Sequence, residues 1–285
     1  MDVKRRKFLK IAGISAIAGI SAPTAFSSLL KGEAGASSEG GNAKAAEKSA
    51  GHGEKKRTGK QLGLVVNTRI FKEVDGLAEK CTKACHTVHN VPDFGNPKDE
   101  IKWLWKEPYE HAFPEHSNHM RSEGLNTLPI LVLCNHCENP PCVRACPTKA
   151  TFKNASNGIV MMDYHRCIGC RFCMAACPYG ARSFNWRNPR ELDANGNYKF
   201  FPNGIDAKFP TRTRGVVEKC NFCAKRLKEG KQPACVEASD SIRGRGLIFG
   251  NVNDPHSEIS RVLSENFTIQ RKPSAGTLPS VFYII

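Results

Sequence analysis

The stretch "CIGCRFCMAACP", residues 167–178, decides the fold, because four cysteines follow one another at a spacing that suits one kind of cofactor. Cys167, Cys170 and Cys173 stand three residues apart, and Cys177 follows one helical turn later, ahead of a proline. A loop of this spacing wraps a cube of four irons and four sulfides with three thiolates, while its backbone N–H groups point at the sulfides. The fourth cysteine faces away and ligates a neighbouring cluster. The stretch therefore predicts a 4Fe-4S site with a second site beside it.

A second copy of this run lies upstream in "CNHCENPPCVRACP", residues 134–147, with two extra residues between its second and third cysteines. If the two runs exchange their fourth ligands, every cysteine between residues 134 and 177 has a role. A zinc site would use two cysteine pairs and leave the third and fourth cysteine of each run without one. We therefore predict two clusters, one held by Cys134, Cys137, Cys142 and Cys177, and the other by Cys167, Cys170, Cys173 and Cys146.

A third run is stretched and incomplete. In "CNFCAKRLKEGKQPACVEAS", residues 220–239, Cys220, Cys223 and Cys235 keep the order of the first three ligands. Ser239 stands where the fourth cysteine belongs. This run therefore needs a thiolate from elsewhere and donates none in return.

The stretch "CTKACHTVHN", residues 81–90, supplies that thiolate. Cys81 and Cys85 have the spacing of third and fourth cysteines, and the two positions expected before them hold Asp75 and Ala78. The site that would have used Cys81 lacks its three other ligands, so we expect Cys81 to be a buried, inert thiol. By the exchange rule, Cys85 completes the site of Cys220, Cys223 and Cys235.

The thirteen cysteines therefore give twelve ligands for three 4Fe-4S clusters, with one cysteine left over. If cysteines had been lost independently of one another, several clusters would lack a ligand. Here the missing ligands all belong to one site. We expect that site to have lain at one end of the series of clusters, because a missing cluster in the middle would force electrons to tunnel over a long distance. The alternative for "CTKACH" is a haem with His86 as axial ligand, although the usual spacing is C-x-x-C-H and the haem would take Cys85 from its cluster.

The N-terminus, "MDVKRRKFLKIAGISAIAGISAPTAFSS", places Arg5 and Arg6 ahead of a weakly apolar run and resembles a twin-arginine export signal. The alternative is a short membrane anchor, but Pro23 ends the run before the roughly 18 residues that a span requires. Residues 1–36 are therefore expected to be the signal and residues 37–62 a flexible linker. A signal of this type implies that the protein is exported folded, with its metal already loaded, and works in the periplasm.

The formal net charge of +15 is not by itself a sign of nucleic-acid binding. Leaving out residues 1–62 reduces it to about +8, and three clusters with their thiolates would add about −6. The folded part of the chain with its three clusters bound is then close to neutral, so we expect no nucleic-acid partner. No Ser/His/Asp set, carboxylate pair or phosphate loop accompanies the cysteines, which indicates a carrier of electrons rather than an enzyme with its own substrate.

Outside the cysteine runs, the pattern predicts short strands and few helices. Strands are expected at "LGLVVNTRIF" and "LPILVL", on both sides of an Asn/Gly turn in residues 150–163, and within residues 214–220 and 245–252. The glycines of "GRGLIFG", residues 244–250, are expected to allow close packing of a strand. One helix is expected in "NDPHSEISRVLSEN", with Asp254 as its N-cap.

Four cysteine motifs in which the first pairs with the fourth and the second with the third, behind such a signal, resemble the tandem-ferredoxin electron-transfer subunits of membrane oxidoreductases. The resemblance covers roughly residues 63–285, including "CNHCENPPCVRACPTKATF", "FGNVNDPHSEISRVL" and "GTLPSVFYI". It implies an α+β fold of two interleaved bacterial-ferredoxin-like modules with short strands and cluster-binding loops. The inner module would span residues 128–215, and the outer module would combine residues 63–127 with residues 216–285.

The degenerate first motif and Ser239 are most similar to the periplasmic ferredoxin-like subunits of membrane complexes in dissimilatory sulfur metabolism. This resemblance implies a relay of single electrons between a quinone-interacting, NrfD-type integral membrane subunit and a periplasmic multihaem cytochrome c, within a complex of several subunits. Two alternatives stay open. One is the iron–sulfur subunit of a molybdopterin-dependent reductase, and the other is a zinc-stapled binding protein without a redox role.

Overall fold

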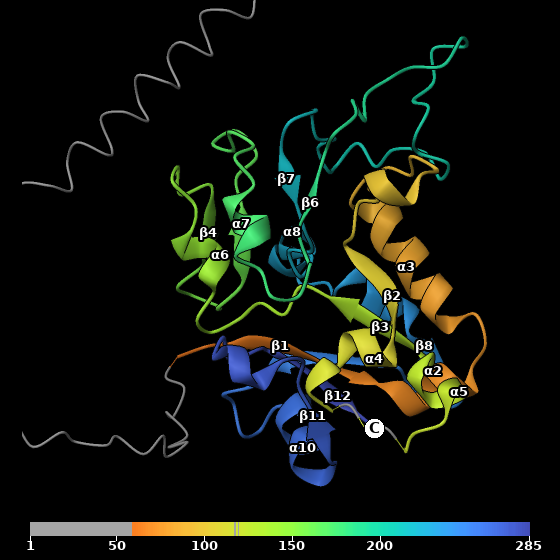
Figure 1. Cartoon of the computed structure of the whole chain (residues 1–285), viewed down its shortest axis with the longest axis vertical. Helices are drawn as coiled ribbons and strands as arrows, with labels where there is room; N and C mark the ends of the chain where they lie inside the picture. Colours follow the sequence, from red (N-terminus) through yellow and green to blue (C-terminus); the bar gives the residue numbers. More distant parts are fainter. Residues whose placement is uncertain (1–58, 117, 119) are drawn as a thin grey trace, which may run out of the picture. The chain divides into compact units, whose positions relative to one another are not determined.

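A four-stranded sheet brings the first described strand together with the last ones. The computed structural model describes residues 59–116, 118 and 120–285, which fall within a unit spanning Lys55–Ile285. The sheet order is β10-β1-β12-β11. Strand β1 (Leu62–Asn67) runs antiparallel to β10 (Leu247–Asn251) and parallel to β12 (Val281–Ile284), and β11 (Thr268–Ile269) pairs with β12 (Figure 1). The predicted signal, residues 1–36, and the predicted linker up to residue 58 lie outside the described residues.

The other described strands pair two by two in antiparallel ladders. These are β2 (Leu104–Pro108) with β3 (Pro129–Leu133), β4 (Thr151–Lys153) with β5 (Val160–Met162), β6 (Ser183–Phe184) with β7 (Val217–Glu218), and β8 (Asp240–Ser241) with β9 (Gly244–Arg245). Cys134 directly follows β3, and Cys220 comes two residues after the end of β7. The ladders therefore fix where two of the cysteine runs begin.

Short helices carry the third cysteine of each complete or stretched run. Cys142 lies in α6, Cys173 in α7 and Cys235 in α9, and the longer α3 buries Leu77, Cys81 and Cys85 along one face. The helix bounds are α2 (Thr68–Glu73), α3 (Leu77–Val88), α4 (Tyr109–Ala112), α5 (Glu123–Asn126), α6 (Pro141–Arg144), α7 (Phe172–Ala175), α8 (Ala224–Lys228), α9 (Ala234–Ala238) and α10 (Glu258–Glu265). Single 3-10 turns are η1 (Pro97–Asp99), η2 (Pro114–His116) and η3 (Pro273–Ala275).

Most of the expected strands are present, and the fold is α+β with short strands as predicted. The strand in "LPILVL" and the two strands around the Asn/Gly turn are confirmed. Within residues 214–220 the strand is only Val217–Glu218. The close packing expected for the glycine-rich strand is also confirmed, because a Cβ added at Gly246 would lie 2.8 Å from Cζ of Phe71. The interleaving of two modules stays a prediction.

Two boundaries were predicted wrongly. The strand expected over residues 62–71 ends at Asn67, where its register with β12 reaches Ile284, and Thr68 begins α2 instead. The N-cap of the C-terminal helix is Ser257, whose Oγ accepts from the backbone N–H of Ser260 at 3.2 Å, and not Asp254. Asp254 turns the chain just before the helix, since its carboxylate accepts from the backbone N–H of His256 at 3.0 Å.

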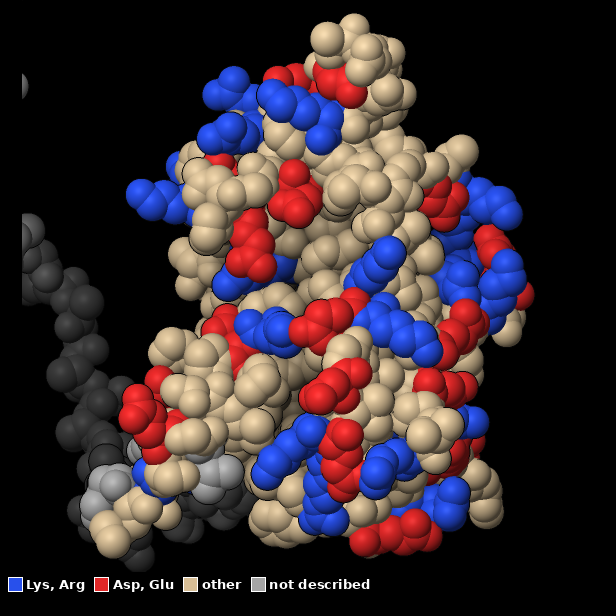
Figure 2. Space-filling model, turned by 90° about the vertical axis from the view of Figure 1, so that its right-hand side faces the viewer, with Lys and Arg blue, Asp and Glu red and all other residues tan. Residues whose placement is uncertain are grey.

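Charged residues of both signs are mixed on the face seen in Figure 2, where blue and red side chains alternate. Within the part of the chain that the structure describes, no helix has the length and apolar character needed to cross a membrane.

Candidate iron–sulfur cluster sites

The three Cys-x-x-Cys loops share one backbone turn. The residue before the second cysteine has a positive φ in each loop, 41° at His136, 71° at Gly169 and 52° at Phe222. This conformation is uncommon for His and Phe, so the loop imposes it and not the residue type. Backbone N–H groups around such a turn form a concave anion-binding surface, which is the arrangement that many Fe–S sites use. The stretched third run therefore shares with the first two a positive φ at the residue before its second cysteine, and there Cys223 also has a positive φ of 52°.

The first predicted ligand set lines one small cavity, which we call the central site. Its four cysteines are Cys134, Cys137, Cys142 and Cys177, and Tyr179 and Arg182 are among the other residues that line it. Burial raises the pKa of the Cys137 thiol to about 12, and the nearby sulfurs of Cys134, Cys142 and Cys177 add to this. A guanidinium nitrogen of Arg182 donates to Sγ of Cys142 at 3.0 Å. The structure thus brings the four predicted ligands together beside a buried cation.

The second predicted set lines another small cavity, here called the end site. Its cysteines are Cys146, Cys167, Cys170 and Cys173. The backbone N–H of Val217 donates to Sγ of Cys167 at 3.5 Å. Burial opposes ionisation of the Cys146 thiol, but hydrogen bonds from the backbone N–H groups of Thr151, Thr148 and Ala150 and from the Thr148 side chain lower its pKa overall. Ile168 and Phe172, which flank these cysteines in sequence, are 67% and 60% exposed, so this site lies close to the surface.

The third predicted set is fully buried and is called the outer site. It consists of Cys85 from α3 together with Cys220, Cys223 and Cys235. Burial raises the pKa of the Cys85 thiol well above its usual value, and the sulfurs of the other three cysteines raise it further. Backbone N–H groups donate to two of the sulfurs at 3.4 Å, from Phe222 to Cys220 and from Ala234 to Cys223. Cys85, the ligand predicted only from the exchange rule, therefore lies among its predicted partners.

The central site neighbours both of the others. Besides burial, the sulfur of Cys134 is the main cause that raises the pKa of the Cys220 thiol, to about 12. The ring of His136 stacks on that of Phe222 with centroids 3.7 Å apart, which joins the central loop to the outer loop. On the other side, Arg182 hydrogen-bonds Cys142 and also lies close enough to Cys173 to affect the ionisation of its thiol.

The residues that the sequence pattern assigns to a lost fourth site have other surroundings in the structure. Cys81 is 0% exposed, and burial raises its pKa to about 12, as expected for an inert thiol. Ser239 is buried and uses its hydroxyl within the backbone, donating to the carbonyl of Val236 at 2.7 Å and accepting from the N–H of Leu247 at 3.0 Å. Asp75 is exposed. None of these groups is presented as a ligand.

The residues at the three sites fit an iron–sulfur cluster. The donors at each site are sulfurs, and backbone N–H groups or Arg182 hydrogen-bond to several of them, as in proteins that hold an anionic cluster. Among the described residues no group of three or more His, Cys, Asp or Glu could hold a single metal ion. A four-iron cube is larger than one ion, so its thiolates stand further apart. The ligand sets themselves remain predictions of the sequence pattern.

The haem alternative gains no support from the surroundings of α3. His86 lines a cavity of about 380 Å³ with residues that include Trp105 and Lys106, but neither Cys81 nor Cys85 lines it. Both thiols are buried on the face of the helix that packs into the core. A porphyrin in this cavity would therefore not meet the two sulfurs that have to bind it.

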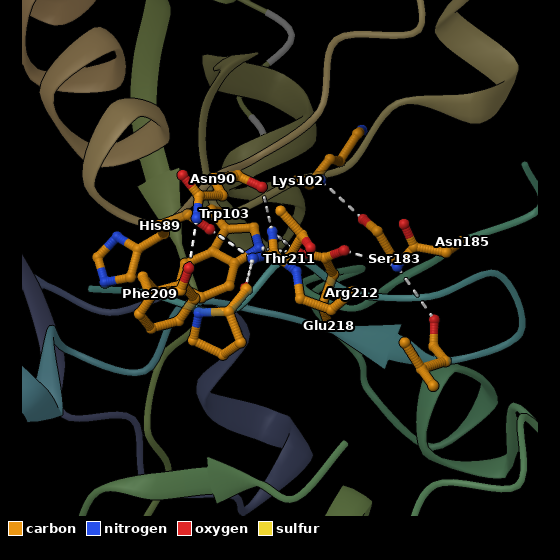
Figure 3. Close-up of polar contacts among 12 residues, drawn as sticks. His89, Asn90, Lys102, Trp103, Ser183, Asn185, Phe209, Thr211, Arg212 and Glu218 are labelled. Atoms are coloured by element: carbon orange, nitrogen blue, oxygen red, sulfur yellow. Dashed lines mark hydrogen bonds and ion pairs between the residues drawn. The ribbon is translucent and has the colours of Figure 1, made fainter. Parts of the chain in front are cut away.

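A buried polar network ties α3 to the strand that leads into Cys220 (Figure 3). Arg212 and Glu218 form an ion pair of 2.5 Å with both side chains fully buried. Nε1 of Trp103 donates to the same carboxylate at 2.7 Å. Arg212 also donates to the backbone carbonyls of His89 and Asn90, which follow α3. The network thus holds together the two segments that supply the outer site.

Replacing Arg212 with methionine should strongly destabilise the protein. The change leaves the Glu218 carboxylate buried without its cation, and breaking a buried pair in this way costs about 3–5 kcal/mol of unfolding free energy. The measurement is the denaturant midpoint under anaerobic conditions. The double variant Arg212→Met/Glu218→Met is the control, and it should lose less than the single variant. Equal losses would show that packing and not the stranded charge is responsible.

Sequence reasoning missed this network and the role of Arg182. Arg212 contacts residues 122 and 123 positions away, and no local spacing marks it as buried. Arg182 lies five residues after Cys177, in a run of ordinary composition. The only sequence signal is a basic residue within strongly cysteine-rich surroundings, which is weak because the chain has 42 Lys and Arg.

Comparisons with known proteins support 4Fe-4S cluster binding by this chain. The 4Fe-4S dicluster domain family matches residues 128–193. The Hdr-like menaquinol oxidoreductase iron-sulfur subunit 1 of Archaeoglobus fulgidus is 44% identical over 211 residues, which is 71% of this chain and 71% of that protein. The iron-sulfur cluster-binding subunit of menaquinone reductase from Nitratidesulfovibrio vulgaris is 34% identical over 228 residues, 72% of this chain and 82% of that one. The arsenate respiratory reductase subunit ArrB of a Shewanella species is 34% identical over 247 residues, 79% and 96%.

Proposed function

This chain belongs to the family of iron–sulfur electron-transfer subunits of membrane-associated quinol oxidoreductases and reductases, and from that premise we propose that it relays single electrons through three 4Fe-4S clusters. The observation that carries the proposal is the grouping of twelve cysteines into the central, end and outer sites. Bound clusters would supply one-electron oxidation and reduction. The chain's own residues would hold them and arrange them with the central site between the other two.

We further propose that the subunit is DsrO-like and works in the periplasm as part of a complex of dissimilatory sulfur metabolism. Its partners would be an NrfD-type integral membrane subunit and a periplasmic multihaem cytochrome c, with electrons passing between them through this chain. The degenerate first motif, with Asp75 and Ala78 in place of ligands, supports this assignment. The similarity to a menaquinol oxidoreductase subunit supports a quinone-linked partner. Residues 1–36 would act as the twin-arginine signal for export.

A second candidate function is that of the iron–sulfur subunit in a molybdopterin-dependent reductase. The similarity that spans 96% of an arsenate respiratory reductase subunit favours it. Both candidate functions use the same three clusters, and they differ in the redox partner subunit of the complex. Purification of the intact complex separates them, because a c-type cytochrome should accompany the chain in the first case and a pterin-containing subunit in the second.

Metal analysis of the anaerobically purified chain tests the proposal. We expect about twelve irons and twelve acid-labile sulfides per chain, and EPR signals of three interacting clusters after reduction. Zinc in place of iron, with neither colour nor EPR signal, would instead establish the zinc-stapled binding protein. Pyridine haemochrome absorbance at one haem per chain would contradict the assignment of Cys85 to the outer site.

A further inference from the structure

Three buried cations without a carboxylate partner lie around the central site. Of the described Lys and Arg residues, Arg182, Arg212, Lys219 and Arg271 are buried. Arg212 pairs with Glu218, whereas none of the other three has an ion-pair partner among the described residues. A buried charge is costly unless an opposite charge compensates it. The three cations therefore require a counter-charge that no described carboxylate provides.

Arg182 lies between the central and end sites. It is 4% exposed, and its two terminal nitrogens donate to Sγ of Cys142 and to Oγ1 of Thr151, both at 3.0 Å. Burial alone would lower the pKa of this guanidinium, but the sulfurs of Cys142 and Cys173 raise it above its ordinary value. The cation is thus in contact with one site and close to the next.

Lys219 lies between the central and outer sites. It is 1% exposed, and its Nζ donates to two backbone carbonyls, those of Val160 and, at 2.6 Å, Cys220. Its charge also favours ionisation of the adjacent Cys220 thiol. A lysine that is buried with only neutral acceptors has the same need for a nearby anion as Arg182.

The two cations meet at the central loop. His136, between Cys134 and Cys137, is fully buried, and its pKa is lowered by burial first and then by the charges of Lys219 and Arg182. Arg271 lies behind the same site, 5.7 Å from the ring of Tyr179, with one guanidinium nitrogen lacking a partner. The end site therefore has one of the two cations beside it, the outer site has the other, and the central site has both.

A bound cluster would supply the missing counter-charge. Four thiolates around a 4Fe-4S core give a net charge of about −2, which becomes about −3 after one-electron reduction. A fixed cation stabilises the more negative, reduced state most, and a hydrogen bond to a ligand sulfur acts in the same direction. Both effects raise the reduction potential, and both are stronger in a buried site than in water.

On the basis of the proposed three-cluster relay, we infer that Arg182 and Lys219 together make the central cluster the one with the highest reduction potential of the three. An electron that enters from either end then lowers its energy at the central cluster. That cluster gains one electron as its neighbour loses one. The central site thus acts as the position where the chain holds a single electron between transfers.

The test is a redox titration of the loaded full-length chain, followed by EPR. Arg182→Met and Lys219→Met should each lower the highest of the three potentials by at least about 59 mV, a tenfold change in the oxidised-to-reduced ratio of a one-electron couple. The double variant should lower it further. Arg182→Lys keeps the charge but shortens the reach to Cys142, so it should lower the potential less than Arg182→Met. If Arg182→Met does not bind iron, the potential of Arg182→Lys is compared with that of the wild-type chain instead.

Arg261→Met is the matched control, because Arg261 lies on α10 with its side chain 64% exposed and has a carboxylate partner, Glu265, at 3.7 Å. It should leave all three potentials unchanged. If the wild-type chain loads three clusters but neither cation affects the highest potential, the inference is wrong while the relay stands. If the wild-type chain does not load three clusters, the proposed function itself fails.

Discussion

Replacing Cys142 with serine should remove the central cluster and stop electron transfer between the two ends of the chain. Cys142 lies in α6, is 8% exposed and accepts from Arg182 at 3.0 Å. A serine hydroxyl at this position is a much poorer ligand than a thiolate, and the buried Arg182 loses its anionic partner at the same time. The iron content should fall by about four per chain.

The functional effect follows from the position of the site. Because the central site neighbours both others, its loss leaves the outer and end clusters without an intermediate. Electron transfer from a reductant at one end to a c-type cytochrome at the other should fall to background, while each remaining cluster is still reduced by dithionite. The EPR signal with the highest potential should be the one that disappears. Retention of wild-type transfer would mean that the central site is not on the route.

The second large effect separates two cysteines on one helix. Cys85→Ser should remove the outer cluster and about four irons per chain, because Cys85 is the fourth ligand predicted for it. Cys81→Ser should leave the iron content unchanged. The two residues form a matched pair, one turn apart on α3, 3% and 0% exposed, and each with a pKa raised by burial.

Iron analysis and EPR of the two variants, prepared side by side without oxygen, make the comparison. A general sensitivity of the buried face of α3 would reduce iron in both variants to a similar extent. Loss of iron in Cys81→Ser alone would reverse the assignment of the two residues and would imply that the fourth site is not lost. Only loss in Cys85→Ser alone agrees with the exchange of ligands between the first and the last motif.

The three Cys-x-x-Cys loops could be predicted from the sequence because their information is local. Each loop is set by the spacing of its own cysteines, and the rule that the fourth ligand is exchanged extends this to Cys85 without any knowledge of the fold. The strand in "LPILVL" and the hairpin of β4 and β5 are local in the same sense, since a short apolar run marks the first and a turn signal the second.

The features that the sequence did not predict depend on contacts between distant segments. The expected strand includes residues 68–71, but α2 forms there instead because the register with β12 ends at Ile284. The burial of Arg212 depends on Glu218 and on the end of α3, and that of Arg182 on the sulfur of Cys142. A rule based on local spacing cannot predict which charged side chains become buried, because their partners lie far away in the sequence.

Anomalous scattering at the iron edge from crystals of the anaerobically loaded protein tests the central claim most directly. We expect three compact iron peaks, one within each set of four cysteines, with the middle peak between the loops of Cys134 and Cys177. The outer peak should lie beside Cys85, and Cys81 should have no iron next to it. A map without a peak at Cys85, or with single-ion peaks in place of four-iron cubes, would contradict the account.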